Sequence, residues 1–208
     1  MKPSGNSRIL MALAAVLLLC TFLFPIWRIT LVAPQYPDGI SMYIWINKIT
    51  GDTDYTLQNI NILNHYVGMK YIEPDTIPEL SYFPYVIVGM SLIGLLAAII
   101  RNRYFYLVWV VLLLVLASLG LYDFYLWEYD YGHNLSPNAP IKIPGMAYQP
   151  PLIGVKMLLN FEATSLPHLG SLFIGLAMLL GFLAFIFHKK TQTPKGQMDQ
   201  SPKAVKQR

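Results

Sequence analysis

Four long apolar segments constrain the fold of this 208-residue chain more than any other feature. They cover residues 9–27, 83–100, 104–122 and 169–187, and each is free of Lys, Arg, Asp and Glu. Each is close to the roughly 20 residues that a helix needs to cross a bilayer. Helices are favoured because a segment in lipid must satisfy every backbone N–H and C=O internally. The sequence therefore predicts an all-α membrane protein with four transmembrane helices.

Composition agrees with a membrane location. Charged residues make up 12% of the chain, against about 25% in a typical soluble domain. The single cysteine, Cys20, rules out an internal disulfide. The first apolar segment lacks a small-x-small cleavage site, so we expect an uncleaved helix and no removed signal peptide.

The basic residues predict how the helices are oriented. Cytoplasmic segments next to helix ends carry an excess of Lys and Arg. With the N-terminus inside, the cytoplasmic segments are 1–8, 101–103 and a disordered basic tail at 188–208, and these hold ten of the 15 basic residues. The ten are Lys2, Arg8, Arg101, Arg103, Lys189, Lys190, Lys195, Lys203, Lys206 and Arg208. We therefore predict both termini in the cytoplasm of a bacterial inner membrane, and the same distribution argues against nucleic-acid binding.

The two extracytoplasmic loops, 28–82 and 123–168, are expected to be ordered. Both exceed the 12 to 15 residues beyond which structureless loops become uncommon. In the first loop, partial alternation predicts a short strand within 40–49, and helical spacing predicts a helix over 57–71. The second loop begins as a helical extension over 122–131, and 153–161 is expected to be an amphipathic segment on the membrane surface. The predicted fold class is thus all-α, with short helices in the two loops; a short pair of strands in the loops is the alternative that the pattern leaves open.

Soft metal ligands gather in the predicted outer loops. His65 and Met69 are four residues apart on the predicted helix, so their side chains share a face. Imidazole with thioether suits copper, especially Cu(I). His133, Met146 and His168 would join this site if the loops fold against each other. The alternative is structural: a surface histidine beside a core methionine.

Two acids lie near the outer end of the third apolar segment. Asp123 and Asp130 are seven residues apart and thus on one helix face, and His133 follows. At the membrane edge this polar cluster could hold a metal or relay a proton. It could equally pair with Arg28, Lys142 or backbone donors.

Several function classes lack their sequence signatures. The chain has no C-x-x-C-H, phosphate-loop or G-x-S-x-G motif, which argues against covalent haem, nucleotide phosphates and a hydrolase nucleophile. No ionisable residue lies within an apolar segment, which argues against an ion pump or proton-driven transporter.

Three segments resemble a family of small bacterial multi-pass membrane proteins. They are YPDGISMYIWINKITG at 36–51, LQNINILNHYVGMKYIEP at 57–74 and EYDYGHNLSPNAPIKIPGMAYQPPLIG at 128–154. Members of that family are encoded beside nitrous oxide reductase, a periplasmic copper enzyme. The resemblance implies an accessory role in copper-site assembly or electron supply, and it assigns no catalytic residue.

The leading hypothesis is a non-enzymatic accessory protein that binds copper outside the cytoplasm or assists assembly of a periplasmic copper protein. The alternative is a metal-free structural or docking subunit of a membrane complex, with outer aromatic side chains as interface anchors. A membrane-interface enzyme, with Asp123, Asp130 and His133 as acid–base groups, is less favoured because no nucleophile accompanies them.

Overall fold

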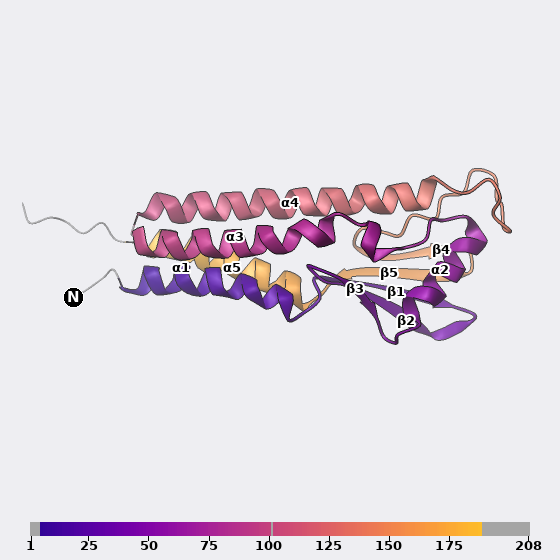
Figure 1. The fold of residues 1–208 in the computed structure, drawn as a ribbon, viewed down its shortest axis with the longest axis horizontal. Coiled ribbons are helices and arrows are strands. Elements are labelled where there is room, and N and C mark those ends of the chain that lie inside the picture. The colour runs from indigo at the N-terminus through magenta and orange to yellow at the C-terminus, as the bar shows by residue number, and fades with distance from the viewer. Residues whose placement is uncertain (1–4, 101, 189–208) are drawn as a thin grey trace, which may run out of the picture.

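The computed structural model describes residues 5–100 and 102–188 and consists of a helix bundle and a sheet domain placed end to end (Figure 1). The bundle contains α1 (Gly5–Leu17) with the 3-10 turn η1 (Leu18–Phe22), α3 (Glu79–Ile100), α4 (Arg103–His133) and α5 (Leu169–Phe187). The sheet domain, residues 27–78 and 123–167, is called the head below. It is built from the two predicted outer loops.

The bundle packs around Trp109. Its side chain is 1% exposed, and its indole Nε1 donates a hydrogen bond of 2.8 Å to the Met90 carbonyl on α3. Gly94 and Gly181 allow the neighbouring helices to approach this ring, because a Cβ at either position would lie about 3.0 Å from it. The interior of the bundle is thus set by one large ring facing small residues.

Within residues 5–100 and 102–188, three helices are long and apolar enough to cross a membrane: α3, α4 and α5. The prediction of four spanning helices is therefore wrong at the first segment. The helical part there is 6–22, about 25 Å long at 1.5 Å per residue, against a hydrocarbon core of about 30 Å. The helix ends before Pro25, and Trp27 already belongs to a strand.

The all-α prediction is also wrong, because the head contains a five-stranded antiparallel sheet. Its strands are β1 (Trp27–Ala33), β2 (Tyr36–Ile44), β3 (Ile49–Gly51), β4 (Gly154–Leu158) and β5 (Phe161–Pro167), in the order β3-β2-β1-β5-β4. Strands from the two outer loops meet at the centre, where β1 pairs with β5 from Trp27↔Pro167 to Val32↔Glu162. The two loops therefore fold as one unit.

Strand β1 alternates along its length. Trp27, Ile29, Leu31 and Ala33 are buried and the residues between them are half-buried, the period of a strand with one face against a core. The segment 153–161, expected as an amphipathic surface element, instead forms β4 and the turn into β5. Val155, Lys156 and Met157 are exposed along β4 and Leu158 at its end is buried in the core, as expected of a strand at the edge of the sheet.

Two further elements cover the inner face of the sheet. Helix α2 (Thr56–Val67) ends at Gly68, which has a left-handed φ of +84°, as helix C-termini often do. A 3-10 turn, η2 (Pro74–Thr76), leads into α3. The head core lies between these elements, the sheet and the outer part of α4, and its buried members are Trp27, Ile29, Leu31, Met42, Ile60, Ile72, Tyr131, Leu158 and Ala163.

Helix α4 joins the two parts of the molecule (Figure 1). Its 31 residues span about 46 Å, roughly 16 Å more than the hydrocarbon core of a bilayer. Its first 20 residues, ending at Tyr122, suffice to cross, and the remainder packs in the head. The predicted tail at 189–208, the first four residues and Arg101 lie outside the described residues.

Candidate functional site

Residues 123–133 of α4 pack with one helix face against the inner face of the sheet. The Phe124 ring contacts the Trp27 ring edge-on at 5.4 Å, and the Trp127 ring lies 4.2 Å from that of Tyr131. Positions 124, 127, 128 and 131 share a helix face because side chains three and four apart are neighbours. Three of these four residues are aromatic, and the fourth is Glu128.

A cavity of about 50 Å³ lies between this helix face, β1 and α2. A buried water needs roughly 10–15 Å³ by this kind of measure, so the cavity has room for a few water-sized groups. The lining residues are Ile29, Leu31, Met42, Ile60, Asn64, Met69, Ile72, Trp127, Glu128, Tyr131, Tyr148, Pro150, Leu158 and Phe161. Lys, Arg and His are absent from this lining.

Glu128 is the ionisable group of the cavity that stands out. Its side chain is 0% exposed, and neither carboxylate oxygen has a hydrogen-bond partner among the described residues. Burial raises the pKa of Glu128 from 4.5 to about 8, because a low-dielectric surrounding disfavours the charged form. Glu128 lies beyond the first 20 residues of α4, a length that suffices to cross a bilayer, and with this pKa its carboxyl is mainly protonated at neutral pH.

Tyr148 supplies a second polar group in the same cavity. Its side chain is 1% exposed, and its hydroxyl has no hydrogen-bond partner within the described ranges 5–100 and 102–188. Its backbone N–H donates to the Gly132 carbonyl at 2.8 Å. A Cβ on Gly132 would lie 2.3 Å from the Gln149 nitrogen, so a glycine here is what lets the 148–150 segment lie against α4.

Asn64 adds an amide to the cavity wall. It is buried, and its Nδ2 donates a hydrogen bond of 3.3 Å to the Lys70 carbonyl. This contact fixes the chain that leaves α2 and keeps the amide in place. The cavity thus combines a carboxyl, a phenol and an amide in otherwise apolar walls.

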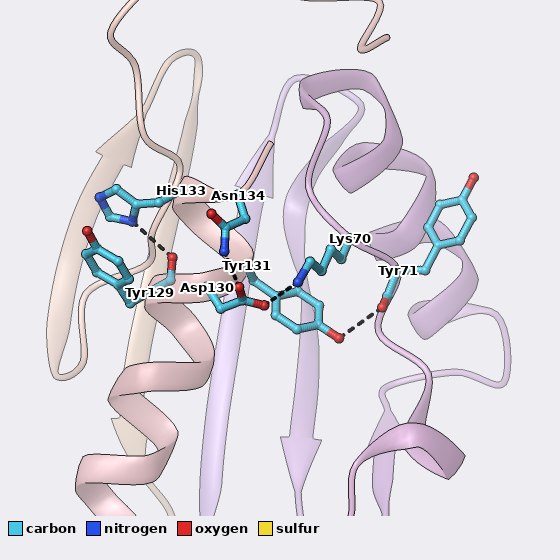
Figure 2. Close-up of polar contacts among 7 residues, drawn as sticks. All are labelled: Lys70, Tyr71, Tyr129, Asp130, Tyr131, His133 and Asn134. Atoms are coloured by element: carbon cyan, nitrogen blue, oxygen red, sulfur yellow. Dashed lines mark hydrogen bonds and ion pairs between the residues drawn. The ribbon is translucent and has the colours of Figure 1, made fainter. Parts of the chain in front are cut away.

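A polar clasp outside the cavity holds the two loops together (Figure 2). The Lys70 ammonium lies 2.5 Å from the Asp130 carboxylate, whose other oxygen accepts a hydrogen bond from Asn134. The Tyr131 hydroxyl donates to the Tyr71 carbonyl at 3.0 Å. The hydrogen bond from Lys70 lowers the pKa of Asp130. Lys70 and Tyr71 of loop one therefore bind the C-terminal end of α4 beside the cavity.

The predicted copper ligands of loop one point to different places. His65 is exposed, and its Nδ1 lies 3.4 Å from the Tyr71 hydroxyl. Met69 is half-buried and lines the cavity, as does the buried Met42. The two residues of the expected His-Met pair thus contact different surroundings, because α2 ends at Val67 and Met69 lies beyond it.

The predicted ligands of loop two lie apart as well. His133 is exposed and stacks on Tyr129 at 3.9 Å, and its Nδ1 donates to the Tyr129 carbonyl at 3.0 Å. Met146 is exposed. The His168 ring meets the Tyr43 ring edge-on at 5.6 Å, where β5 runs into α5.

His133 and His168 lie at different levels of the head. Trp27 pairs with Pro167, next to His168, and its ring contacts Phe124. His133 lies nine residues further along α4, about 13 Å at 1.5 Å per residue. Among the described residues no group of three or more His, Cys, Asp and Glu is placed to hold a metal. The structure therefore does not bring His65, Met69, His133, Met146 and His168 into one site.

The predicted acidic cluster is also divided. Asp130 pairs with Lys70 and Asn134, not with Arg28 or Lys142. Asp123 instead lies within electrostatic reach of Glu79 at the start of α3. The seven-residue spacing puts both acids on α4, but each has its own surroundings.

Glu128 and Tyr148 were not predicted as site residues from the sequence. A signal for Glu128 was present, since it occupies a position on the apolar stripe of 124, 127 and 131. A charged residue on the apolar face of a helix indicates either a special site or a wrong face assignment. Tyr148 has no comparable signal, because its burial depends on the close approach at Gly132.

Comparisons with known proteins add no relative: the chain matched no protein family, no curated protein and no solved structure.

Proposed function

We propose that this chain is a membrane-anchored accessory protein whose head acts on the extracytoplasmic side of a bacterial inner membrane. The continuous α4 is the observation that carries this proposal, because one helix is long and apolar enough to cross a bilayer and also forms a wall of the head. The other end of the bundle lies far from the head, and Ser7 and His188 meet there at 3.4 Å. In the sequence, the segments that adjoin these helix ends carry the excess of Lys and Arg, which supports a cytoplasmic location for both termini.

Cysteine labelling tests this orientation. Asn138 in the head and Asn102 between α3 and α4 are both exposed, and Cys20→Ser gives a background without other thiols. A membrane-impermeant maleimide on intact cells should label Asn138→Cys and should label Asn102→Cys only after lysis. The reverse pattern would refute the orientation.

Docking of a partner protein is the function that the geometry of the head supports best. Strand β4 is an edge of the sheet, and edge strands offer unpaired backbone groups to an added strand. Val155 is 60% exposed and Met157 62% exposed, and Ile153 continues this apolar surface. The occupant we propose is an extended segment of an extracytoplasmic partner that pairs with β4.

A photo-crosslinking amino acid in place of Met157 tests the docking edge. The control carries the same amino acid in place of Asp54, which is exposed and follows β3 at the opposite edge of the sheet. One partner should crosslink at position 157 and not at 54, and Val155→Lys should prevent its stoichiometric co-purification. Equal crosslinking at the two positions, or none at position 157, would refute docking at β4.

Copper handling is the second candidate, and one observation favours it: the thioether side chains of Met42 and Met69 line the cavity that holds Glu128. Thioethers suit Cu(I). The wider set of five predicted ligands does not meet in this fold, so the site would be smaller than the sequence suggested. Cu(I) loading of the purified protein tests the idea, with Met42→Leu/Met69→Leu as the variant that should lose copper and His65→Ala/His133→Ala as the control outside the cavity; a wild-type protein that stays copper-free would remove the idea.

A further inference from the structure

The cavity in the head contains polar groups that the chain itself does not use. Buried polar atoms in folded proteins nearly always have hydrogen-bond partners. Both Glu128 oxygens and the Tyr148 hydroxyl lack one among the described residues, and both side chains line the same cavity. Two unpartnered, fully buried side chains around one small space indicate that a ligand completes them.

The remaining lining determines the charge of that ligand. Four aromatic residues, Trp127, Tyr131, Tyr148 and Phe161, surround the cavity. The faces of aromatic rings carry negative potential and attract cations. A carboxylate among aromatic rings is a setting for an organic ammonium group, whereas an anion would face the Glu128 carboxyl with no Lys, Arg or His in the lining to balance its charge.

We propose that this cavity binds a small organic ammonium ion, with the Glu128 carboxylate as its counter-ion and the Tyr148 hydroxyl as a hydrogen-bond acceptor. The volume of about 50 Å³ restricts the buried part to an ammonium head with few carbons. The source of this head, a free amine or the end of a longer molecule, leaves the chemistry unchanged. The inference goes beyond docking at β4, because the cavity lies on the inner face of the sheet, whereas docking would use the exposed edge of β4.

Binding must release a proton. Glu128 holds its proton at neutral pH while the cavity contains no cation, and it gives that proton to the solvent when the ammonium ion enters. The occupied site is then a neutral ion pair with its hydrogen bonds satisfied. By linkage, affinity rises about tenfold per pH unit below the pKa of the carboxyl and levels off above it.

Other titratable groups near Glu128 do not interfere in that pH range. The walls from β1, β2, α2, β4 and β5 contribute no acid or base to the cavity. The titratable neighbours are the phenols of Tyr131 and Tyr148, and burial raises the pKa of Tyr131 above its ordinary value of 10.0. Lys70 and Asp130 pair with each other on the outside, in the clasp.

Titration calorimetry on the full-length protein in detergent tests the proposal with methylammonium chloride as the probe and sodium chloride as the blank. Running it in two buffers of different ionisation heat counts the protons released. We expect saturable binding, release of about one proton at pH 7 and about tenfold tighter binding at pH 7 than at pH 6. Because Trp127 lines the cavity, the tryptophan fluorescence of the protein should change with the same saturation curve.

Three variants make the result specific. Glu128→Gln should lose binding, and Tyr148→Phe should weaken it several-fold because it removes one hydrogen bond. Asp130→Asn, an exposed carboxyl two residues away, should bind as wild type does. Circular dichroism establishes that each variant is folded before it is compared.

Three outcomes would overturn the proposal. They are no saturable methylammonium binding to folded wild-type protein, binding that survives in Glu128→Gln, and binding without proton release at pH 7. Preferential Cu(I) binding that is lost in Met42→Leu and retained in Glu128→Gln would instead assign the cavity to a metal.

Discussion

Glu128→Gln keeps the size and shape of the buried side chain and removes its ability to ionise. In the wild type the carboxyl has a pKa of about 8 in the folded protein and about 4.5 when unfolded. A raised folded-state pKa means that the folded protein binds more protons than the unfolded chain between these values. The contribution of the Glu128 carboxyl to the free energy of unfolding is therefore fully present below pH 4.5 and is lost as the pH rises to about 8.

The magnitude follows from the two pKa values, at about 1.4 kcal/mol per unit of difference. Relative to the fully protonated state, the wild type loses about 1 kcal/mol at pH 5, about 3 kcal/mol at pH 7 and about 4 kcal/mol at pH 8. The glutamine variant has no such loss. It should be about as stable as wild type at pH 4 and more stable by these amounts at higher pH.

Thermal unfolding in detergent, followed by tryptophan fluorescence across this pH range, measures the effect. For a chain of this size 1 kcal/mol shifts Tm by about 2–4 °C, so the variant should unfold roughly 6–12 °C higher than wild type at pH 7. Parallel curves of Tm against pH for the two proteins would refute the reasoning, because they would show that Glu128 does not change its protonation on unfolding.

Three further predictions concern neighbouring features. Gly132→Ala should destabilise the protein by about 1–3 kcal/mol through the clash with Gln149, whereas Gly89→Ala, which meets nothing within 4 Å, should not; chemical denaturation compares them. Asp130→Asn should cost at most about 1 kcal/mol at neutral pH, since its ion pair is exposed; the cost should shrink below pH 3.8 and vanish as the pH falls through the lowered pKa of Asp130, the opposite sign to Glu128. Trp109→Phe should cost about 1–3 kcal/mol in thermal unfolding, through its lost hydrogen bond and volume.

The membrane helices were predictable because their signal is local. Apolar runs such as 104–122 satisfy their backbone groups within the segment, so composition and length are enough to identify them. The prediction of a spanning helix over 9–27 was wrong at its C-terminal end. Trp27 is apolar enough for a membrane helix and equally suited to the buried face of a strand. Only its partner, Pro167, distinguishes the two states, and that partner lies far away in the sequence.

The short strand predicted within 40–49 is confirmed by β2 and β3, but the rest of the sheet and the cavity depend on distant contacts and were not predicted. Alternation from Arg28 to Ala33 is short, and short apolar runs do not by themselves separate strand from helix. Glu128 has the same limitation: its position on the apolar stripe was visible, but its burial requires β1 and the 148–150 segment to lie against α4. The predicted soft ligands, in contrast, lie in the head or at its border but not in one site, because their places in the sequence predict only which loop holds each of them.

Helix α4 makes the bundle and the head mechanically dependent on each other. The helix is unbroken from Arg103 to His133, so a rotation or tilt at its outer end is transmitted to its membrane part without a hinge to absorb it. Glu128 lies in the part that the clasp and the sheet hold. Any change in the charge of this carboxyl therefore acts on a wall that the membrane helix also forms, and a ligand that stabilises the ionised form would favour one packing of α4 against the sheet over others.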